Sequence, residues 1–76
     1  MTPPKMPKVG DAVHYHVSEE PRAAFVTEVG QDAAVGLVIF YPSSISFAAY
    51  ASYSPDGELG TWRFPEENTN DKFVVA

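Results

Sequence analysis

The sequence has no cysteine and few basic residues, and these two absences exclude several classes of protein. Without cysteine, none of its 76 residues can form a disulfide framework or a thiolate metal site. Ten acidic residues outnumber five basic ones, and Lys5 and Lys8 both lie near the N-terminus. Residues 9–76 therefore carry ten acids against three bases, a net charge of −7. A phosphate-binding surface needs clustered basic side chains, so we expect no direct nucleic-acid partner.

Long hydrophobic runs are also missing. The longest run, residues 35–41, is far shorter than the span of about 20 apolar residues that crosses a bilayer. The N-terminal segment holds basic residues and prolines but no apolar stretch of the kind found in signal peptides. We therefore expect neither membrane attachment nor an export signal.

The length of the chain leaves room for one domain with a modest core, because a chain this short buries only about 60% of its unfolded surface. Three prolines in the first eight residues predict an extended arm over residues 1–8. We expect a small β-barrel domain at residues 9–66 and a polar tail at residues 67–76 that ends in an apolar triplet.

Alternating apolar residues predict five short strands, near residues 13–17, 23–29, 35–41, 45–51 and 60–64. The sequence at residues 54–57 is a strong turn signal and predicts a hairpin between the fourth and fifth strands. A Gly-Asp turn before an alternating strand, as at Gly10 and Asp11, is typical of SH3-like barrels. The predicted fold is all-β, a small antiparallel five-stranded SH3-like barrel with terminal extensions.

The core and the contact surface can be assigned in outline from the aromatic and aliphatic residues. Trp62 and Phe64 lie two apart on an expected strand, so they share a face. The aromatic residues exceed what a core of this size readily hides, which predicts a surface contact patch. Tyr50 and Tyr53 flank a serine-rich turn, and Phe73 belongs to the final apolar triplet. The expected core consists of Val13, Tyr15, Phe25, Leu37, Ile39 and Trp62, and the partner-binding candidates are Tyr50, Tyr53, Phe73, Lys5 and Lys8.

His14 and His16 lie two apart on the first expected strand, which places both imidazoles on one face about 7 Å apart at the backbone. Two metal ligands can use that spacing, but a third ligand, such as Glu28 across the ladder, would be needed. The ordinary interpretation is a half-solvated polar face, and we expect no metal and no cofactor.

No residue set predicts catalysis. The adjacent acidic pairs diverge on a strand or loop, whereas catalytic carboxylates must converge on one bond. The serines lack a nucleophile elbow, and the glycines are scattered singly rather than in a phosphate-binding loop. We therefore expect a protein that is not an enzyme.

Four sequence blocks, in order, resemble a group of small all-β proteins encoded by actinobacteria and their tailed bacteriophages. The blocks are Gly-Asp-x-Val-His-Tyr from Gly10, Arg-Ala-Ala-x-Val-Thr-Glu-Val from Arg22, Val-Gly-Leu from Val35 and Gly-Thr-Trp-x-x-Pro-Glu from Gly60. They cover residues 9–66. The resemblance implies a phage origin and a small β fold.

This chain departs from that group at three places. Pro21 stands where the group usually has a cysteine, the loop at residues 18–20 is shorter, and Trp62, Arg63 and Phe64 replace a usual Trp-His-Trp. Thiol or metal chemistry at these positions is therefore not implied for this chain.

These observations together predict a non-enzymatic phage structural protein, a capsid-associated minor or decoration protein in the virion. Its partner would be the major capsid protein or another virion protein, or a second copy of the chain, bound through aromatic contacts and the terminal arms. The alternative is a small effector in the host cytoplasm that binds a host protein or a signalling nucleotide. A nucleotide site would have to be built from Arg63 beside Trp62.

Overall fold

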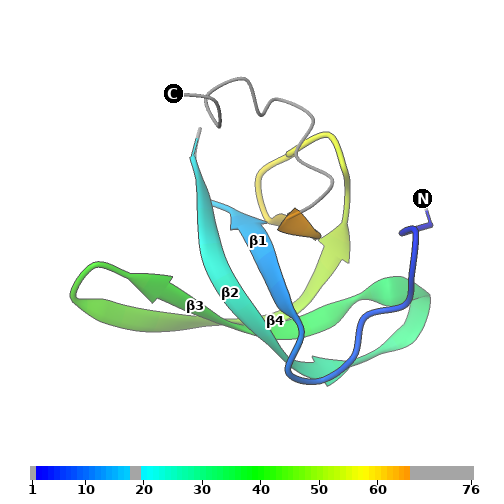
Figure 1. Ribbon diagram of the computed structural model, residues 1–76, viewed down its shortest axis with the longest axis horizontal. Coiled ribbons are helices and arrows are strands. Elements are labelled where there is room, and N and C mark those ends of the chain that lie inside the picture. Colours follow the sequence, from blue (N-terminus) through cyan, green and yellow to red (C-terminus); the bar gives the residue numbers. More distant parts are fainter. Residues whose placement is uncertain (1, 18–19, 66–76) are drawn as a thin grey trace.

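The computed structural model describes residues 2–17 and 20–65, and it forms a closed barrel of five strands (Figure 1). The strands are β1 (Ala12–His16), β2 (Pro21–Val29), β3 (Val35–Tyr41), β4 (Ser44–Tyr53) and β5 (Thr61–Arg63). One turn of 3₁₀ helix, η1 (Gln31–Ala33), joins β2 to β3. Each strand pairs with the next, and β5 returns to β1. The prediction of a small all-β barrel of five strands is confirmed.

The barrel is not antiparallel throughout, because β4 and β5 run parallel. Ser52 pairs with Thr61 and Tyr53 with Trp62 in this parallel ladder, whereas the other four neighbouring pairs are antiparallel. A closed ring with an odd number of strands cannot alternate in direction all the way round. The predicted hairpin at residues 54–57 is therefore wrong. Residues 54–60 instead form a loop that returns the chain beside β4.

Trp62 lies at the centre of the core and is completely buried. Its indole nitrogen donates a 2.9 Å hydrogen bond to the carbonyl oxygen of Ala33. The rings of Tyr53 and Phe64 each pack edge-on against the indole, with centroids 5.0 Å away. Satisfying the indole donor matters because an unpaired buried donor costs about 1–3 kcal/mol. Of the expected core residues, four are buried: Val13, Leu37, Ile39 and Trp62.

Phe25 is not in the core, and this expectation is wrong, since its side chain is 46% exposed. The register of β1 with β2 pairs Val13 with Ala24, so Ala24 faces inward and Phe25 outward. Tyr15, also expected in the core, is only partly buried and packs against its margin.

Two β-bulges flank Gly36 of β3. On one side an extra residue enters β2 between Val26 and Glu28, and on the other an extra residue enters β4 opposite the step from Val35 to Leu37. A Cβ atom at Gly36 would lie 3.1 Å from Oγ1 of a β2 threonine, Thr27. The absence of a side chain therefore lets both bulged strands approach β3 closely.

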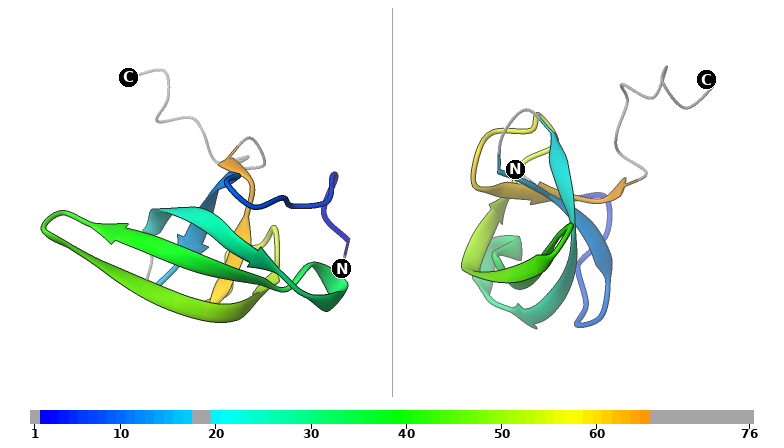
Figure 2. Two further views of the ribbon diagram at one scale, coloured as in Figure 1. Left: turned by 90° about the horizontal axis from the view of Figure 1, so that it is seen from below. Right: turned by 90° about the vertical axis from the view of Figure 1, so that its left-hand side faces the viewer.

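The β3–β4 hairpin extends beyond the rest of the barrel, at the opposite end of the long axis from the N-terminal arm (Figures 1 and 2). The ladder between β2 and β3 ends at the pair Ala24 and Ile39, so the tip of the hairpin separates from β2. The guanidinium of Arg22 lies over the ring of Tyr41, 5.0 Å from its centroid. This contact supports the hairpin on its inner side.

Candidate functional site

The outer surface of β2, β3 and β4 carries large apolar side chains. Val38 alternates with buried neighbours on β3 and therefore faces away from the core. Its cross-strand partners, Phe25 on β2 and Phe47 on β4, share that outward direction. The next outward pair on β3 and β4 is Phe40 with Ile45. We call these five residues the apolar face.

The apolar face is exposed to solvent. Phe47 is 72% exposed and Ile45 is 54% exposed, although both are large hydrophobic residues. Phe25 and Phe40 pack edge-to-face, with centroids 5.4 Å apart at an interplanar angle of 81°. Single exposed apolar residues are common on protein surfaces, but a contiguous cluster of this kind usually marks an interaction site.

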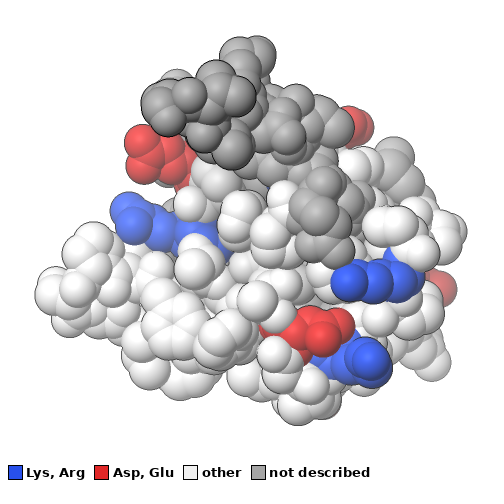
Figure 3. Space-filling view, viewed as in Figure 1, with Lys and Arg blue, Asp and Glu red and all other residues white. Residues whose placement is uncertain are grey.

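The surroundings of the apolar face are uncharged. No charged residue occurs in the sequence between Asp32 and Asp56, a stretch that includes all of β3 and β4. The space-filling view shows the surface over the β3–β4 hairpin without acidic or basic side chains, while charge lies over other elements (Figure 3). A chain with a net charge of −5 thus keeps this surface neutral.

Tyr50 is exposed, as expected of a contact residue, but it already makes an intramolecular bond. Its hydroxyl donates a 2.8 Å hydrogen bond to Oε2 of Glu28. That hydrogen bond and the negative charge of Glu28 raise the pKa of Tyr50. The ring also lies beside Gly30, where an added Cβ would approach it to 2.9 Å. Tyr50 therefore fastens the bulged end of β4 to β2.

Tyr53 is not a surface contact, and this expectation is wrong. It is only 8% exposed, and its ring packs on Trp62. The parallel pairing of β4 with β5 places Tyr53 directly beside Trp62, which the serine-rich sequence around it does not indicate. Phe73, the third aromatic candidate, lies outside the described residues.

The two lysine candidates lie on the arm, which contacts its own barrel. The ammonium of Lys5 sits over the ring of Phe64, 4.8 Å from the centroid. The backbone N–H of Lys8 donates a 2.8 Å hydrogen bond to Oδ2 of Asp11. Both lysine side chains are exposed, while Pro3 and Pro7 are buried. Residues 2–8 therefore pack on the barrel from which they arise.

His14, His16 and Arg63 form a polar cluster on β1 and β5. His14 and Arg63 are cross-strand partners, and a loop covers His16, which is only 3% exposed. Gly57 of that loop lies so close that an added Cβ would be 3.5 Å from the imidazole of His16. Arg63 donates through Nη1 to the carbonyl of Pro55, 3.0 Å away. The predicted half-solvated face is thus wrong for His16.

The environment of this cluster disfavours protonation of both histidines. Burial lowers the pKa of each imidazole, and the positive charge of Arg63 lowers both further. The described residues offer no hydrogen-bond partner to Nδ1 of His14, Nε2 of His16 or Nε of Arg63. The cluster is thus an enclosed polar region in which the guanidinium of Arg63 lies near two imidazoles that resist protonation.

The three residues considered as metal ligands do not converge. His14 pairs with Ala23 on β2, and Glu28 is five residues further along that strand, about 16 Å away at 3.3 Å per residue. Glu28 instead accepts the hydrogen bond of Tyr50. Within residues 2–17 and 20–65, no group of three histidine or acidic side chains has the geometry to hold a metal ion.

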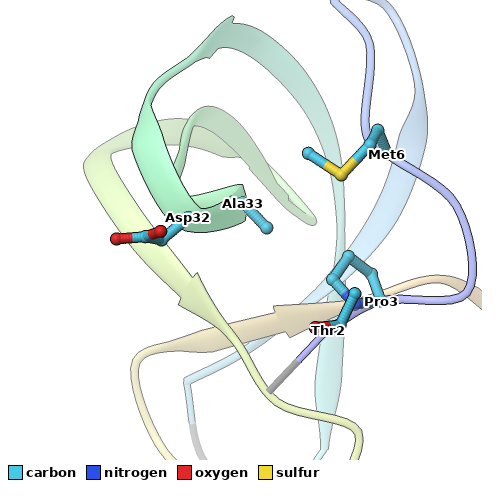
Figure 4. Close-up of a pocket in the computed structure, with 5 residues that line it drawn as sticks. All are labelled: Thr2, Pro3, Met6, Asp32 and Ala33. Atoms are coloured by element: carbon cyan, nitrogen blue, oxygen red, sulfur yellow. The ribbon is translucent and has the colours of Figure 1, made fainter.

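A pocket of about 450 Å³ lies between the arm and η1 (Figure 4). Thr2, Pro3 and Met6 line it from the arm, and Asp32 and Ala33 line it from η1. Among these described lining residues the one ionisable side chain is that of Asp32, so they offer no basic side chain to a phosphate group. The described part of the chain also contains no helix long and apolar enough to cross a membrane.

Sequence reasoning predicted a surface patch of aromatic residues but did not place it on the residues of the apolar face, although one signal for them was present. Apolar residues occupy both alternating positions of β3, so both faces of this strand are apolar. The uncharged stretch continues through β4, in which most residues are exposed. Only the register shows that Phe47 and Ile45 lie beside Phe25 and Phe40 on one surface.

Comparison of the chain with protein-family models, with curated proteins and with solved structures found no match.

Proposed function

We propose that this protein is a non-enzymatic binding protein that attaches to another polypeptide through the apolar face. The observation that carries the proposal is the exposed, uncharged cluster of Phe25, Val38, Phe40, Ile45 and Phe47 on one side of the barrel. Covering these side chains removes apolar surface from water, which is the main favourable contribution in most protein association. The partner would need a complementary apolar surface and no particular charge.

We propose further that the partner is the capsid lattice of a tailed bacteriophage, on which the chain acts as a minor or decoration protein. The sequence blocks that resemble proteins of actinobacteria and their phages support this partner. The size of the face is also suitable. Fully burying one large apolar side chain contributes about 1.5–3 kcal/mol, while association itself costs about 4–15 kcal/mol. Five partly exposed side chains give modest affinity for each copy, which suits a surface with many repeated sites.

The structure does not favour the nucleotide-binding alternative. That interpretation needs Trp62 available for stacking beside Arg63, but Trp62 is completely buried. Arg63 donates to the carbonyl of Pro55 and packs with the histidine cluster. An effector that binds a host protein would use the same apolar face, and the experiment below separates it from a virion component.

The proposal is tested by quantitative mass spectrometry of purified virions from a phage that encodes the chain. We expect a fixed ratio of this protein to the major capsid protein that matches the symmetry of the particle. The complementary measurement is co-sedimentation of added protein with particles that lack it. Phe47→Ser should reduce co-sedimentation at least tenfold. Leu59→Ser is the matched control, because Leu59 is equally exposed but lies in the loop before β5.

Two results would contradict the proposal in different ways. In the first, the protein is absent from virions while Phe47→Ser still weakens its binding to a host protein. In that case the apolar face is the binding site, and the partner is the host protein instead of the capsid. Equal binding by wild type, Phe47→Ser and Leu59→Ser would show that the apolar face is not the site.

A further inference from the structure

One edge of β4 is unpaired over most of its length. On one side β4 is paired with β3 from Ser44 onward. On the other side, within the described residues, β5 pairs only with Ser52 and Tyr53. Among the described residues, residues 44–48 therefore have an unpaired strand edge, and in a β-ladder alternate residues direct their N–H and C=O groups to that side.

This edge has none of the usual protection over residues 44–48. Natural proteins blunt exposed edges with charged side chains, proline or a bulge. Residues 44–48 contain only serine, isoleucine, phenylalanine and alanine. The bulge in β4 comes after this segment, between Ala48 and Ala51, where Tyr50 has a φ of 57°. A neutral, apolar edge of this kind is a template for pairing with another strand.

We propose that residues 44–48 of β4 pair antiparallel with the same residues of a second copy of this chain, with Ser46 opposite Ser46 and Ile45 opposite Phe47. The inference goes beyond the proposed function, because it names a second interface and does not depend on which polypeptide the apolar face binds.

The charge distribution favours a second copy as the occupant. Two molecules of net charge −5 repel one another, and like charges placed opposite in a ladder are destabilising. β3 and β4 carry no charge, so two copies that meet at this edge keep their acidic residues away from the contact. A strongly basic or acidic partner strand would find no opposite charge here. An apolar, neutral strand suits the edge, and β4 is such a strand.

The symmetry of the pairing limits it to a dimer. Antiparallel pairing of identical strands is isologous, so each copy contributes the same surface. Each copy has one such edge on β4, and the pairing uses it completely. The result is a closed pair rather than an open series of molecules.

The pairing also joins the two apolar faces. The two-fold axis of an antiparallel pair of edge strands runs perpendicular to the sheet, so outward side chains of both copies point to the same side. Phe47 and Ile45 of one copy then lie next to those of the other. The dimer presents one continuous apolar surface twice as large, and two linked contacts bind a repeating partner more tightly than one.

The test is the molar mass of the full chain in solution, measured by analytical ultracentrifugation across a range of concentrations. Ser46→Lys places a charge on the edge, on the side of β4 opposite the apolar face, where Ser46 is exposed. Ser43→Lys makes the same change in the exposed hairpin turn and is the matched control. We expect wild type and Ser43→Lys to be dimers and Ser46→Lys to be monomeric, with its dimer dissociation constant raised at least tenfold. Ile45→Lys is the second edge variant if Ser46→Lys does not fold.

Hydrogen exchange of the wild type provides a measurement that needs no variant. Backbone amides within residues 44–48 that point away from β3 should exchange slowly at high concentration and faster on dilution. A monomeric wild type, an open-ended series of oligomers, or a dimer unaffected by both edge lysines would overturn the proposal. A monomer that still binds virions through Phe47 would overturn only this inference and leave the proposed function intact.

Discussion

The hydroxyl of Tyr50 donates a 2.8 Å hydrogen bond to Oε2 of Glu28, and this bond joins the two strands that flank β3. Each residue lies at a β-bulge, and Gly36 of β3 lies between the bulges. Tyr50 has a φ of 57°, a conformation that few residues other than glycine adopt. The bond and the packing of the ring beside Gly30 hold Tyr50 in that conformation.

The first prediction concerns the titration of Tyr50. The carboxylate of Glu28 stabilises the neutral phenol, so Glu28→Gln should lower the pKa of Tyr50 toward its ordinary value of 10.0. Absorbance of tyrosinate as a function of pH measures this change, and Tyr50→Phe identifies which transition belongs to Tyr50. Glu58→Gln removes a carboxylate elsewhere and should leave the transition in place. An unchanged transition in Glu28→Gln would show that the bond is not formed in solution.

The second prediction concerns the close approach at Gly36. Gly36→Ala adds a Cβ that would lie 3.1 Å from Oγ1 of Thr27 and 3.4 Å from Cβ of Glu28. We expect the free energy of unfolding to fall by about 1–3 kcal/mol, the usual cost of overpacking. Urea denaturation measures it. Thr27→Ala removes the hydroxyl and should restore part of the loss in the double variant, whereas simple additivity would contradict this cause.

The third prediction separates residues that bind from residues that stabilise the fold. Phe47 is mostly exposed, so Phe47→Ser should change the free energy of unfolding by less than about 0.5 kcal/mol. Leu37 is fully buried on the same ladder, and Leu37→Ala should cost about 2–5 kcal/mol. Both are measured by urea denaturation at low protein concentration, so that association does not contribute. A large loss in Phe47→Ser would mean that the apolar face belongs to the core.

The fourth prediction concerns pH. Burial and the charge of Arg63 lower the pKa of both His14 and His16 below 6.5 in the folded state. The unfolded chain therefore binds more protons as the pH falls through 6.5, and stability is lost below that value. The stability contributed by the two uncharged histidines is fully present above pH 6.5 and is lost as the pH falls through their pKa values in the folded state.

Thermal unfolding between about pH 7 and about pH 5 measures this dependence before the acidic residues begin to titrate. A double variant, His14→Gln with His16→Gln, should lose much of the slope. Asp56 and Glu58 of the covering loop are exposed, and Asp56→Asn should leave the slope unchanged. An equal slope in the wild type and the histidine variant would remove the cluster as its origin.

Much of the fold could be predicted from the sequence, because alternation and turn residues are local properties. The alternation around Val13, the compact apolar run of β3 and the spacing of Trp62 and Phe64 each predicted a strand. Alternation defines two faces of a strand, however, and not which of them is buried. On β2 the larger residue, Phe25, lies outside, because the register with β1 turns Ala24 inward.

The parallel pairing of β4 with β5 could not be predicted, because it is a property of the closed ring. The turn sequence after Tyr53 is compatible with a hairpin and also with the loop that the structure contains. Closure on β1 decides between them, and it places Tyr53 against Trp62. The same closure pairs β5 with only the last two residues of β4, so among the described residues the first part of that edge has no partner strand. Local sequence patterns do not show this.

The lone indole at the centre of the barrel gives this molecule a built-in optical reporter. Its emission depends on the enclosure formed by Tyr53, Phe64 and the carbonyl of Ala33, and each of these lies away from the outward surface of β4. Its fluorescence will therefore change when the barrel unfolds and stay constant when two molecules dimerise or the protein binds a particle. Spectroscopy and sedimentation thus monitor separate events in one sample.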